Sequence, residues 1–223
     1  MILHIEQVLS PEEVERIVIK LKDAEFIDGA ATAGWHAKQV KHNTQLKGND
    51  PLNQELRGVV NQALQRNRLF QAAIRPKTIR SVLFSRYEPG MEYGYHVDNA
   101  LMGDELPMRS DVSLTLFLSA PSTYTGGELV IDTSLGEQSF KLEAGAMIVY
   151  PSSTLHCVAP VTAGIRYAAV TWVQSFVRDA SDREILFDLD TAQKVMFEKS
   201  GKTPEFDLVS KSLANLLRKW ADV

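Results

Sequence analysis

The sequence contains little cysteine, no long apolar run and no cluster of like charges. Cys157 is the only cysteine among 223 residues, which rules out a disulfide within the chain and fits a reducing cytoplasm. The longest apolar stretches, such as residues 144–150, are interrupted by glycine and fall far short of the ~20 residues that a membrane helix needs. The N-terminus shows neither the cationic start nor the cleavage site of a signal peptide. We therefore expect a cytoplasmic protein that does not bind membranes.

The charge pattern and the missing glycine motifs exclude further classes of protein. The 24 Lys and Arg residues are balanced by 28 Asp and Glu residues without any basic block, so we expect no binding to nucleic acid. No G-x-G-x-x-G or phosphate-binding loop opens a helix, which argues against a nucleotide-binding α/β fold. With 44% hydrophobic residues, the chain has the composition of one globular unit of catalytic size.

Helices are predicted at both ends of the chain. Ser10, Pro11 and Glu13 form the start signal of a first helix, and Asp50-Pro51 that of a second. Residues 26–48 show weak periodicity and are interpreted as irregular structure or short strands. Near the C-terminus, Ser181 and Glu184 predict the start of a third helix as a capping box, and Gly201 and Pro204 separate it from a fourth.

The middle of the chain has the pattern of an all-β structure. Short runs of alternating or β-branched residues are separated by Gly, Pro, Ser and Asp, which is typical of a sandwich or barrel. We expect strands at residues 79–87, 113–118, 128–131, 138–142, 146–150 and 167–173. The predicted organisation is an N-terminal helical support (1–76), a β core (77–178) and a C-terminal helical appendage (179–223).

Three residues have the chemistry and spacing of a metal site. Residues i and i+2 of a strand point to the same face, so His96 and Asp98 would converge if they lie on one strand. His156 follows a predicted strand and supplies a second imidazole. Two imidazoles and one carboxylate form a facial triad that suits Fe(II), although zinc hydrolases use the same ligands.

Arg166 favours iron over zinc. It opens the predicted strand at residues 166–172, and pairing beside the His156 strand would place it on the same face as Trp172. A buried arginine needs an anionic partner, and its planar fork suits a carboxylate. A metal centre with open positions and a nearby guanidinium fits a keto acid with two carboxylates. The alternative for Arg166 alone is a salt bridge to a surface acid.

The other conspicuous residues are interpreted as structural. His4, His36 and His42 have no partner at ligand spacing, and Cys157 would face away from the metal because it follows His156 on a strand. Gly126-Gly127 is predicted to be a tight turn. Trp35 and residues 41–46 are interpreted as a loop packed on the barrel, with substrate contact as the alternative.

The motif His96-x-Asp98, His156 and Arg166 resembles the Fe(II)/2-oxoglutarate-dependent dioxygenases, in particular the prolyl 4-hydroxylase-like group. Residues 28–46 and the helical tail are similar to bacterial PKHD-type hydroxylases, a group associated with iron-uptake genes. Further matching segments are Tyr87-Glu88-Pro89-Gly90, Thr115-Leu116-Phe117-Leu118, Gly126-Gly127-Glu128-Leu129 and Leu155-His156 through Arg166. The resemblance implies a mainly β fold with flanking helices around a double-stranded β-helix, or jelly-roll.

The resemblance also implies a function. His96, Asp98 and His156 would hold Fe(II), and Arg166 would bind the 5-carboxylate of 2-oxoglutarate with support from Tyr87. O2 would be the second cosubstrate, succinate and CO2 the products, and ascorbate an accessory reductant that re-reduces Fe(III). In relatives a second tyrosine reaches the cosubstrate from the strand that corresponds to residues 115–117, where this chain has none.

Several alternatives remain open at this point. The substrate is expected among peptidyl side chains, amino acids and siderophore-like small molecules, and an oligomer is compatible with the C-terminal helices. A non-catalytic jelly-roll that senses iron or 2-oxoglutarate is the first rival function. A zinc hydrolase is the second, although it leaves Arg166 unexplained.

Overall fold

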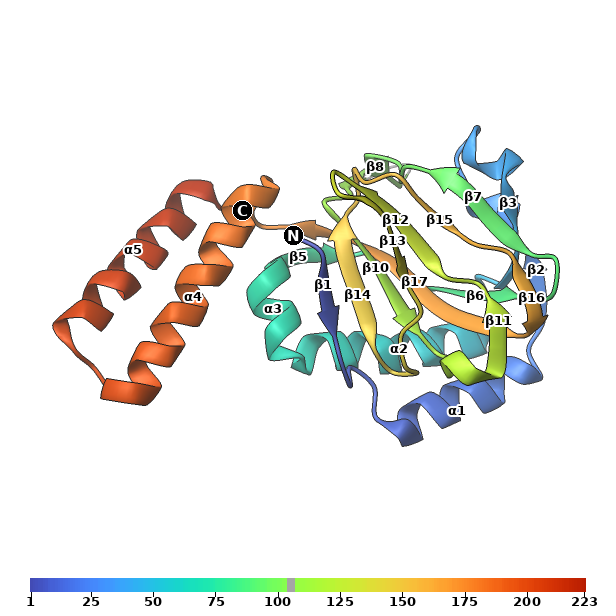
Figure 1. Ribbon diagram of the computed structural model, residues 1–223, viewed down its shortest axis with the longest axis horizontal. Coiled ribbons are helices and arrows are strands. Elements are labelled where there is room, and N and C mark those ends of the chain that lie inside the picture. The colour runs from blue at the N-terminus through green and yellow to red at the C-terminus, as the bar shows by residue number, and fades with distance from the viewer. Residues whose placement is uncertain (104–106) are drawn as a thin grey trace.

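Two antiparallel sheets face each other and form the body of the protein (Figure 1). The computed structural model describes residues 1–103 and 107–223. In this part of the chain the larger sheet has eight strands, and its path runs β1-β14-β10-β17-β6-β4-β2 with β5 paired to β17. The smaller sheet has five strands in the order β13-β12-β15-β7-β3. The mainly β architecture that the sequence predicts is therefore present.

The strands are short, as the turn residues between them predict. Those of the larger sheet are β1 (Leu3–Ile5), β2 (Phe26–Asp28), β4 (Thr44–Leu46), β5 (Pro76–Ile79), β6 (Leu83–Tyr87), β10 (Val112–Phe117), β14 (Met147–Pro151) and β17 (Arg166–Ser175). Those of the smaller sheet are β3 (Lys41–His42), β7 (Glu92–His96), β12 (Leu129–Thr133), β13 (Gly136–Phe140) and β15 (His156–Val158). Two further pairs are formed by β8 (Leu101–Met102) with β9 (Met108–Arg109), and by β11 (Tyr124–Gly126) with β16 (Val161–Gly164).

Alternation along the strands of the larger sheet produces two separate cores. On β10, Leu114 and Leu116 point outward and pack in a cluster with the three N-terminal helices, α1 (Pro11–Lys22), α2 (Pro51–Arg66) and α3 (Arg68–Ile74). Phe117 faces the smaller sheet and packs in a second cluster with Leu129 and Ile131 of β12. The helices thus close the outer face of the larger sheet, and the space between the sheets is left for a site.

The helix boundaries confirm most of the predicted start and stop signals. Ser10 and Glu13 form the expected capping box of α1, and Asp50 caps α2. The capping box at Ser181 is wrong, because α4 (Ala180–Ser200) begins one residue earlier and is capped by Asp179, whose carboxylate accepts from the Ser181 N–H. Gly201 ends α4 as predicted, and α5 (Pro204–Trp220) follows. Figure 1 shows α4 and α5 as a hairpin beside the body.

The predicted strand at residues 79–87 is two strands. β5 ends at Ile79 and β6 begins at Leu83, and both pair with the long strand β17. The sequence reads as one run because Ile79, at the end of β5, is followed closely by the apolar residues 82–84. Between them Arg80 donates its N–H to the Trp172 carbonyl at 2.9 Å, which holds the link against β17.

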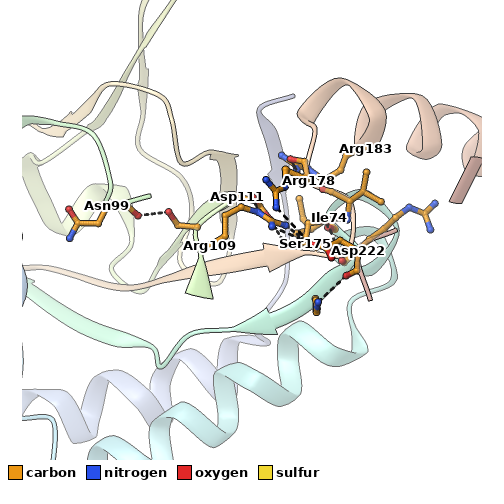
Figure 2. A network of polar contacts seen from close by, with 12 residues as sticks. Ile74, Asn99, Arg109, Asp111, Ser175, Arg178, Arg183 and Asp222 are labelled. Carbon is orange, nitrogen blue, oxygen red and sulfur yellow. Dashed lines mark hydrogen bonds and ion pairs between the residues drawn. The ribbon is translucent and has the colours of Figure 1, made fainter. Parts of the chain in front are cut away.

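A polar network centred on Asp111 joins the body to the C-terminus (Figure 2). Arg109 donates from Nε to Asp111 Oδ1 at 2.6 Å, and the Ser175 N–H donates to Asp111 Oδ2 at 2.8 Å. The Nη1 atom of Arg109 reaches Asp222 Oδ2 at 3.3 Å (Figure 2). One buried carboxylate therefore connects the start of β10, the end of β17 and the last residues of the chain.

Asp111→Ala is expected to destabilise the protein by about 2 kcal/mol, because the half-buried Arg109 and the buried Ser175 N–H lose a charged partner. For a chain of this size the melting temperature should fall by roughly 4–8 °C, which differential scanning calorimetry measures. Asp222→Ala is the matched control: its carboxylate is half exposed, so the loss should stay below ~1 kcal/mol. Equal melting temperatures of Asp111→Ala and wild type would contradict this role.

Candidate active site

His96, Asp98 and His156 come together between the two sheets. His96 ends β7 and His156 begins β15, and these antiparallel neighbours place the two histidines directly opposite each other. One donor atom from each of the three side chains lies within 4.8 Å of the others. The sequence analysis placed His96 and Asp98 on one strand. Asp98 instead lies beyond the end of β7, so strand alternation does not hold it in place. Its carboxylate nevertheless reaches the histidines, at 4.0 Å from His96 Nε2 and 3.8 Å from His156 Nε2.

The hydrogen bonds of the two imidazoles leave their Nε2 atoms available as ligands. The Nδ1 of His96 bonds the Gly94 carbonyl and that of His156 bonds the Thr154 carbonyl, each at 2.9 Å. A carbonyl only accepts, so Nδ1 carries the proton and Nε2 keeps its lone pair. Burial lowers the pKa of His96 to about 4, which keeps the ring neutral at pH 7.

Asp98 is oriented by a pair of buried serines. The Ser113 hydroxyl of β10 donates to Asp98 Oδ2 and lies 2.9 Å from the hydroxyl of Ser152. A hydrogen bond from the opposite sheet therefore fixes one carboxylate oxygen and leaves Oδ1 free for coordination. Two imidazoles whose Nε2 atoms face the carboxylate, and a carboxylate that is itself oriented, are a donor set that fits a divalent iron or zinc ion.

Arg166 reaches the interior from the opposite sheet. It begins β17, which pairs with β10 and β6 and not with the His156 strand, so the pairing assumed from the sequence is wrong. The side chain is 1% exposed, and within the described chain its Nε and Nη2 atoms have no hydrogen-bond partner. Its guanidinium lies over the rings of Tyr87 and Phe117, at 5.1 and 5.4 Å from the centroids. A buried, unpaired guanidinium is costly, and it is the complement of a carboxylate ligand.

The residues around Arg166 leave space for it and include a tyrosine that sequence reasoning missed. Gly127 has φ +68°, and a Cβ there would lie 2.9 Å from Arg166 Cδ and 3.2 Å from Tyr124 Cε2. Tyr124 is buried, and its hydroxyl has no partner among the described residues. Both side chains border the Gly127 backbone, so Tyr124 lies beside Arg166, whose positive charge opposes the rise in the pKa of Tyr124 that burial causes. No sequence motif marks Tyr124. The only nearby signal in the sequence is the predicted turn at Gly126-Gly127.

Tyr87 lies where the sequence predicts a supporting residue. It is directly opposite Arg166 across β6 and β17, and it is buried. Burial raises the pKa of Tyr87, and the positive charge of Arg166 opposes the rise, so the hydroxyl stays protonated. No tyrosine stands on β10, as noted from the sequence. Tyr150 of the neighbouring β14 is buried beside His156 instead, with ring centroids 5.0 Å apart.

A cavity of about 520 Å³ opens onto the three donors. Lys41 and Asn43 line it, so this part of residues 28–46 is more than a loop packed on the barrel. Lys41 is buried; burial lowers the pKa of its ammonium to about 8, while the Asp98 carboxylate opposes that shift. Trp172 also lines the cavity.

The cysteine, the glycine pair and the other three histidines are not among the three donors. Cys157 is buried on β15 next to His156, opposite Val130 of β12. Gly126 and Gly127 have positive φ angles of 75° and 68°, which fits a tight turn. His4, His36 and His42 are not part of the donor cluster, which within the described chain consists of His96, Asp98 and His156.

The sequence is similar to those of known oxygenases and hydroxylases. Residues 82–174 match the sequence profile of the 2OG-Fe(II) oxygenase superfamily. The chain is 58% identical to a PKHD-type hydroxylase of Gloeothece citriformis and 59% identical to one of Picosynechococcus sp., with 100% of each chain covered.

Solved structures with low sequence identity share the fold. A prolyl-4-hydroxylase of Pseudomonas putida superposes with a TM-score of 0.55 at 19% identity, covering 78% of this chain and 92% of that one. A prolyl hydroxylase of Trichoplax adhaerens, in complex with a hypoxia inducible factor peptide, gives 0.56 at 17% identity, with 82% and 86% covered. HygX of Streptomyces hygroscopicus with nickel, 2-oxoglutarate and hygromycin B gives 0.53 at 14%, with 79% and 84% covered. The predicted jelly-roll class is thereby confirmed.

Proposed function

The chain belongs to the PKHD-type hydroxylases of the 2OG-Fe(II) oxygenase superfamily, and from that premise we propose that His96, Asp98 and His156 hold its Fe(II) and that Arg166 binds its 2-oxoglutarate. The protein is a 2-oxoglutarate-dependent dioxygenase. Bound Fe(II) supplies the oxidative chemistry that uses O2 and 2-oxoglutarate to hydroxylate a substrate, with succinate and CO2 as products.

Arg166 is the observation that carries the assignment. Its guanidinium is buried, unpaired within the described chain, and lies across the barrel from the three donor atoms. A dicarboxylate keto acid satisfies both features at once, because one end chelates the metal and the distal carboxylate pairs with the guanidinium. A zinc hydrolase would leave this buried cation without a function. Tyr87, and Tyr124 as an addition from the structure, would donate their hydroxyls to the same carboxylate.

The chain's own groups position the reactants and keep water out. Ser113 holds one oxygen of Asp98, and the backbone carbonyls of Gly94 and Thr154 hold the two imidazoles. The apolar cluster around Phe117, Leu129 and Ile131 surrounds the deep end of the site. A dry, low-dielectric pocket strengthens the contact between Arg166 and a carboxylate.

The family leaves the substrate open, and it is the resemblance to PKHD-type hydroxylases that suggests a link to iron uptake. We place the substrate among peptidyl side chains, amino acids and siderophore-like small molecules, in a process linked to iron uptake in the cytoplasm. Ascorbate would act as an accessory reductant for Fe(III). In the described part of the chain, no helix is both long and apolar enough to cross a membrane.

Metal removal tests the proposed function without knowledge of the substrate. The protein with Fe(II), 2-oxoglutarate and O2 should form succinate slowly even when no substrate is added. Chelation should abolish this turnover, and Fe(II) but not Zn(II) should return it, as followed by chromatography of succinate. Equal recovery with Zn(II), or no consumption of 2-oxoglutarate by the Fe(II)-loaded protein, would contradict the assignment.

A further inference from the structure

Lys41 is a buried cation that the proposed mechanism does not use. It lies on β3, which pairs with the strand that ends in His96, and its side chain lines the cavity. Only 6% of the residue is exposed. Its Nζ donates to the Thr32 hydroxyl at 2.9 Å, which is its one hydrogen bond to a described residue, so two N–H donors remain. The nitrogen also lies 5.1 Å from the centroid of the Tyr93 ring, which stacks on His96 at 3.6 Å.

Asn43 follows Lys41 by two residues and lines the same cavity. It is 4% exposed, and neither its Oδ1 nor its Nδ2 makes a hydrogen bond of good geometry to a described residue, although the Tyr87 hydroxyl lies nearby and Asn43 lowers the pKa of Tyr87. A Cβ on Gly29 would lie 1.9 Å from Asn43 Oδ1, so the glycine makes the space for this amide. Burying an amide without full hydrogen bonding is unfavourable, and a bound polar group would offset that cost.

The charges that line the cavity favour an anion. Lys41, Arg57 and Arg80 line it, and Asp98 is the single carboxylate among its described lining residues. Asp98 acts on Lys41, but its charge would be taken up by the metal to which it is assigned, and Asp28, which also acts on Lys41, does not line the cavity. Arg57 donates a hydrogen bond from Nε to the Val82 carbonyl at 2.9 Å. A concave site lined by one sign of charge raises the local concentration of ions of the opposite sign.

The cosubstrate does not account for these groups. A dicarboxylate keto acid has two carboxylates, of which one is directed to the metal and the other to Arg166. We propose that Lys41 and Asn43 form a second subsite, which binds an anionic oxygen group of the hydroxylated substrate, such as a carboxylate. This inference rests on the proposed function and narrows its substrate: an acid such as a free amino acid fits the subsite, and a neutral peptidyl side chain does not.

A matched pair of probes tests the subsite. N-benzoylglycine and N-benzoylglycinamide differ only in the carboxylate and the carboxamide. Each is titrated calorimetrically into the anaerobic Fe(II)-loaded protein saturated with 2-oxoglutarate, which occupies Arg166. The acid should bind at least ten times more tightly than the amide. Equal affinities, or no detectable binding of either probe, would overturn the subsite.

Substitutions of Lys41 test whether this residue causes the preference for the acid over the amide. Lys41→Met should remove the preference for the acid, and Lys41→Arg should retain it in part. Lys38→Met is the matched control, since Lys38 is exposed in the same segment and does not line the cavity, and it should bind like wild type. A preference that persists in Lys41→Met would place the anion elsewhere and refute the proposal.

Binding of 2-oxoglutarate to the same sample distinguishes a failure of the proposed function from a failure of the subsite alone. Titration of 2-oxoglutarate into the wild-type Fe(II) protein precedes the probes. If 2-oxoglutarate does not bind, the proposed function has failed, and the subsite fails with it. If 2-oxoglutarate binds and the acid and amide are not distinguished, only the subsite is wrong.

Discussion

Replacing Arg166 by methionine is expected to raise the 2-oxoglutarate concentration for half-maximal turnover by at least about 30-fold. Truncating one partner of a buried charge pair costs roughly 2–5 kcal/mol, and 2 kcal/mol corresponds to about 30-fold at 25 °C. The effect should be large because the guanidinium is 1% exposed, and water therefore does not replace the lost contact. Steady-state succinate formation at a series of 2-oxoglutarate concentrations measures it.

The specificity of this effect has its own controls. 2-Oxobutyrate retains the keto acid end of 2-oxoglutarate and lacks the distal carboxylate, so wild type should strongly prefer 2-oxoglutarate and Arg166→Met should lose most of that preference. Arg178→Met removes a cation whose side chain is 72% exposed and should leave the requirement unchanged. An unaltered 2-oxoglutarate requirement in Arg166→Met would refute the assigned role of this residue.

His96→Ala is expected to abolish substrate-free turnover of 2-oxoglutarate. Loss of an outer partner of a metal ligand typically costs about 10–100-fold in metal affinity, and loss of a ligand costs more than that. Fe(II) affinity should therefore fall more than about 100-fold, as measured by anaerobic competition with a chelator. His42→Ala changes an exposed histidine near the same sheet edge and should behave as wild type. Normal turnover by His96→Ala would show that His96 is not a ligand of the catalytic metal.

Local sequence signals predicted local structure well. The Ser10 to Glu13 capping box, the Asp50-Pro51 start and the Gly201 stop act within one helical turn, so their residues alone decide the outcome. At Ser181 two capping residues competed two positions apart, and Asp179 took the N-cap. The convergence of His96, Asp98 and His156 was predictable because each residue type and its spacing carry the chemistry of a metal site.

Contacts between distant segments were not predictable in the same way. The register that puts Arg166 opposite Tyr87, on the sheet that faces the histidines, depends on pairing across nearly eighty residues of chain. No local pattern of the Arg166 strand distinguishes β6 and β10 from β15 as its neighbours. Tyr124, Lys41 and Asn43 also lack a motif. Their importance follows only from burial and from polar groups that the described chain leaves without a full set of hydrogen bonds.

The most direct test of the central claim is an anaerobic titration of the metal-free protein, first with Fe(II) and then with 2-oxoglutarate. A keto acid chelated to Fe(II) gives a weak visible charge-transfer band. We predict that the band appears with one equivalent of each ligand in wild type and in His42→Ala, and that it is absent in His96→Ala. Fe(II) binding without any such band in wild type would contradict the account, because the buried Arg166 and the three donors would then not share a cosubstrate.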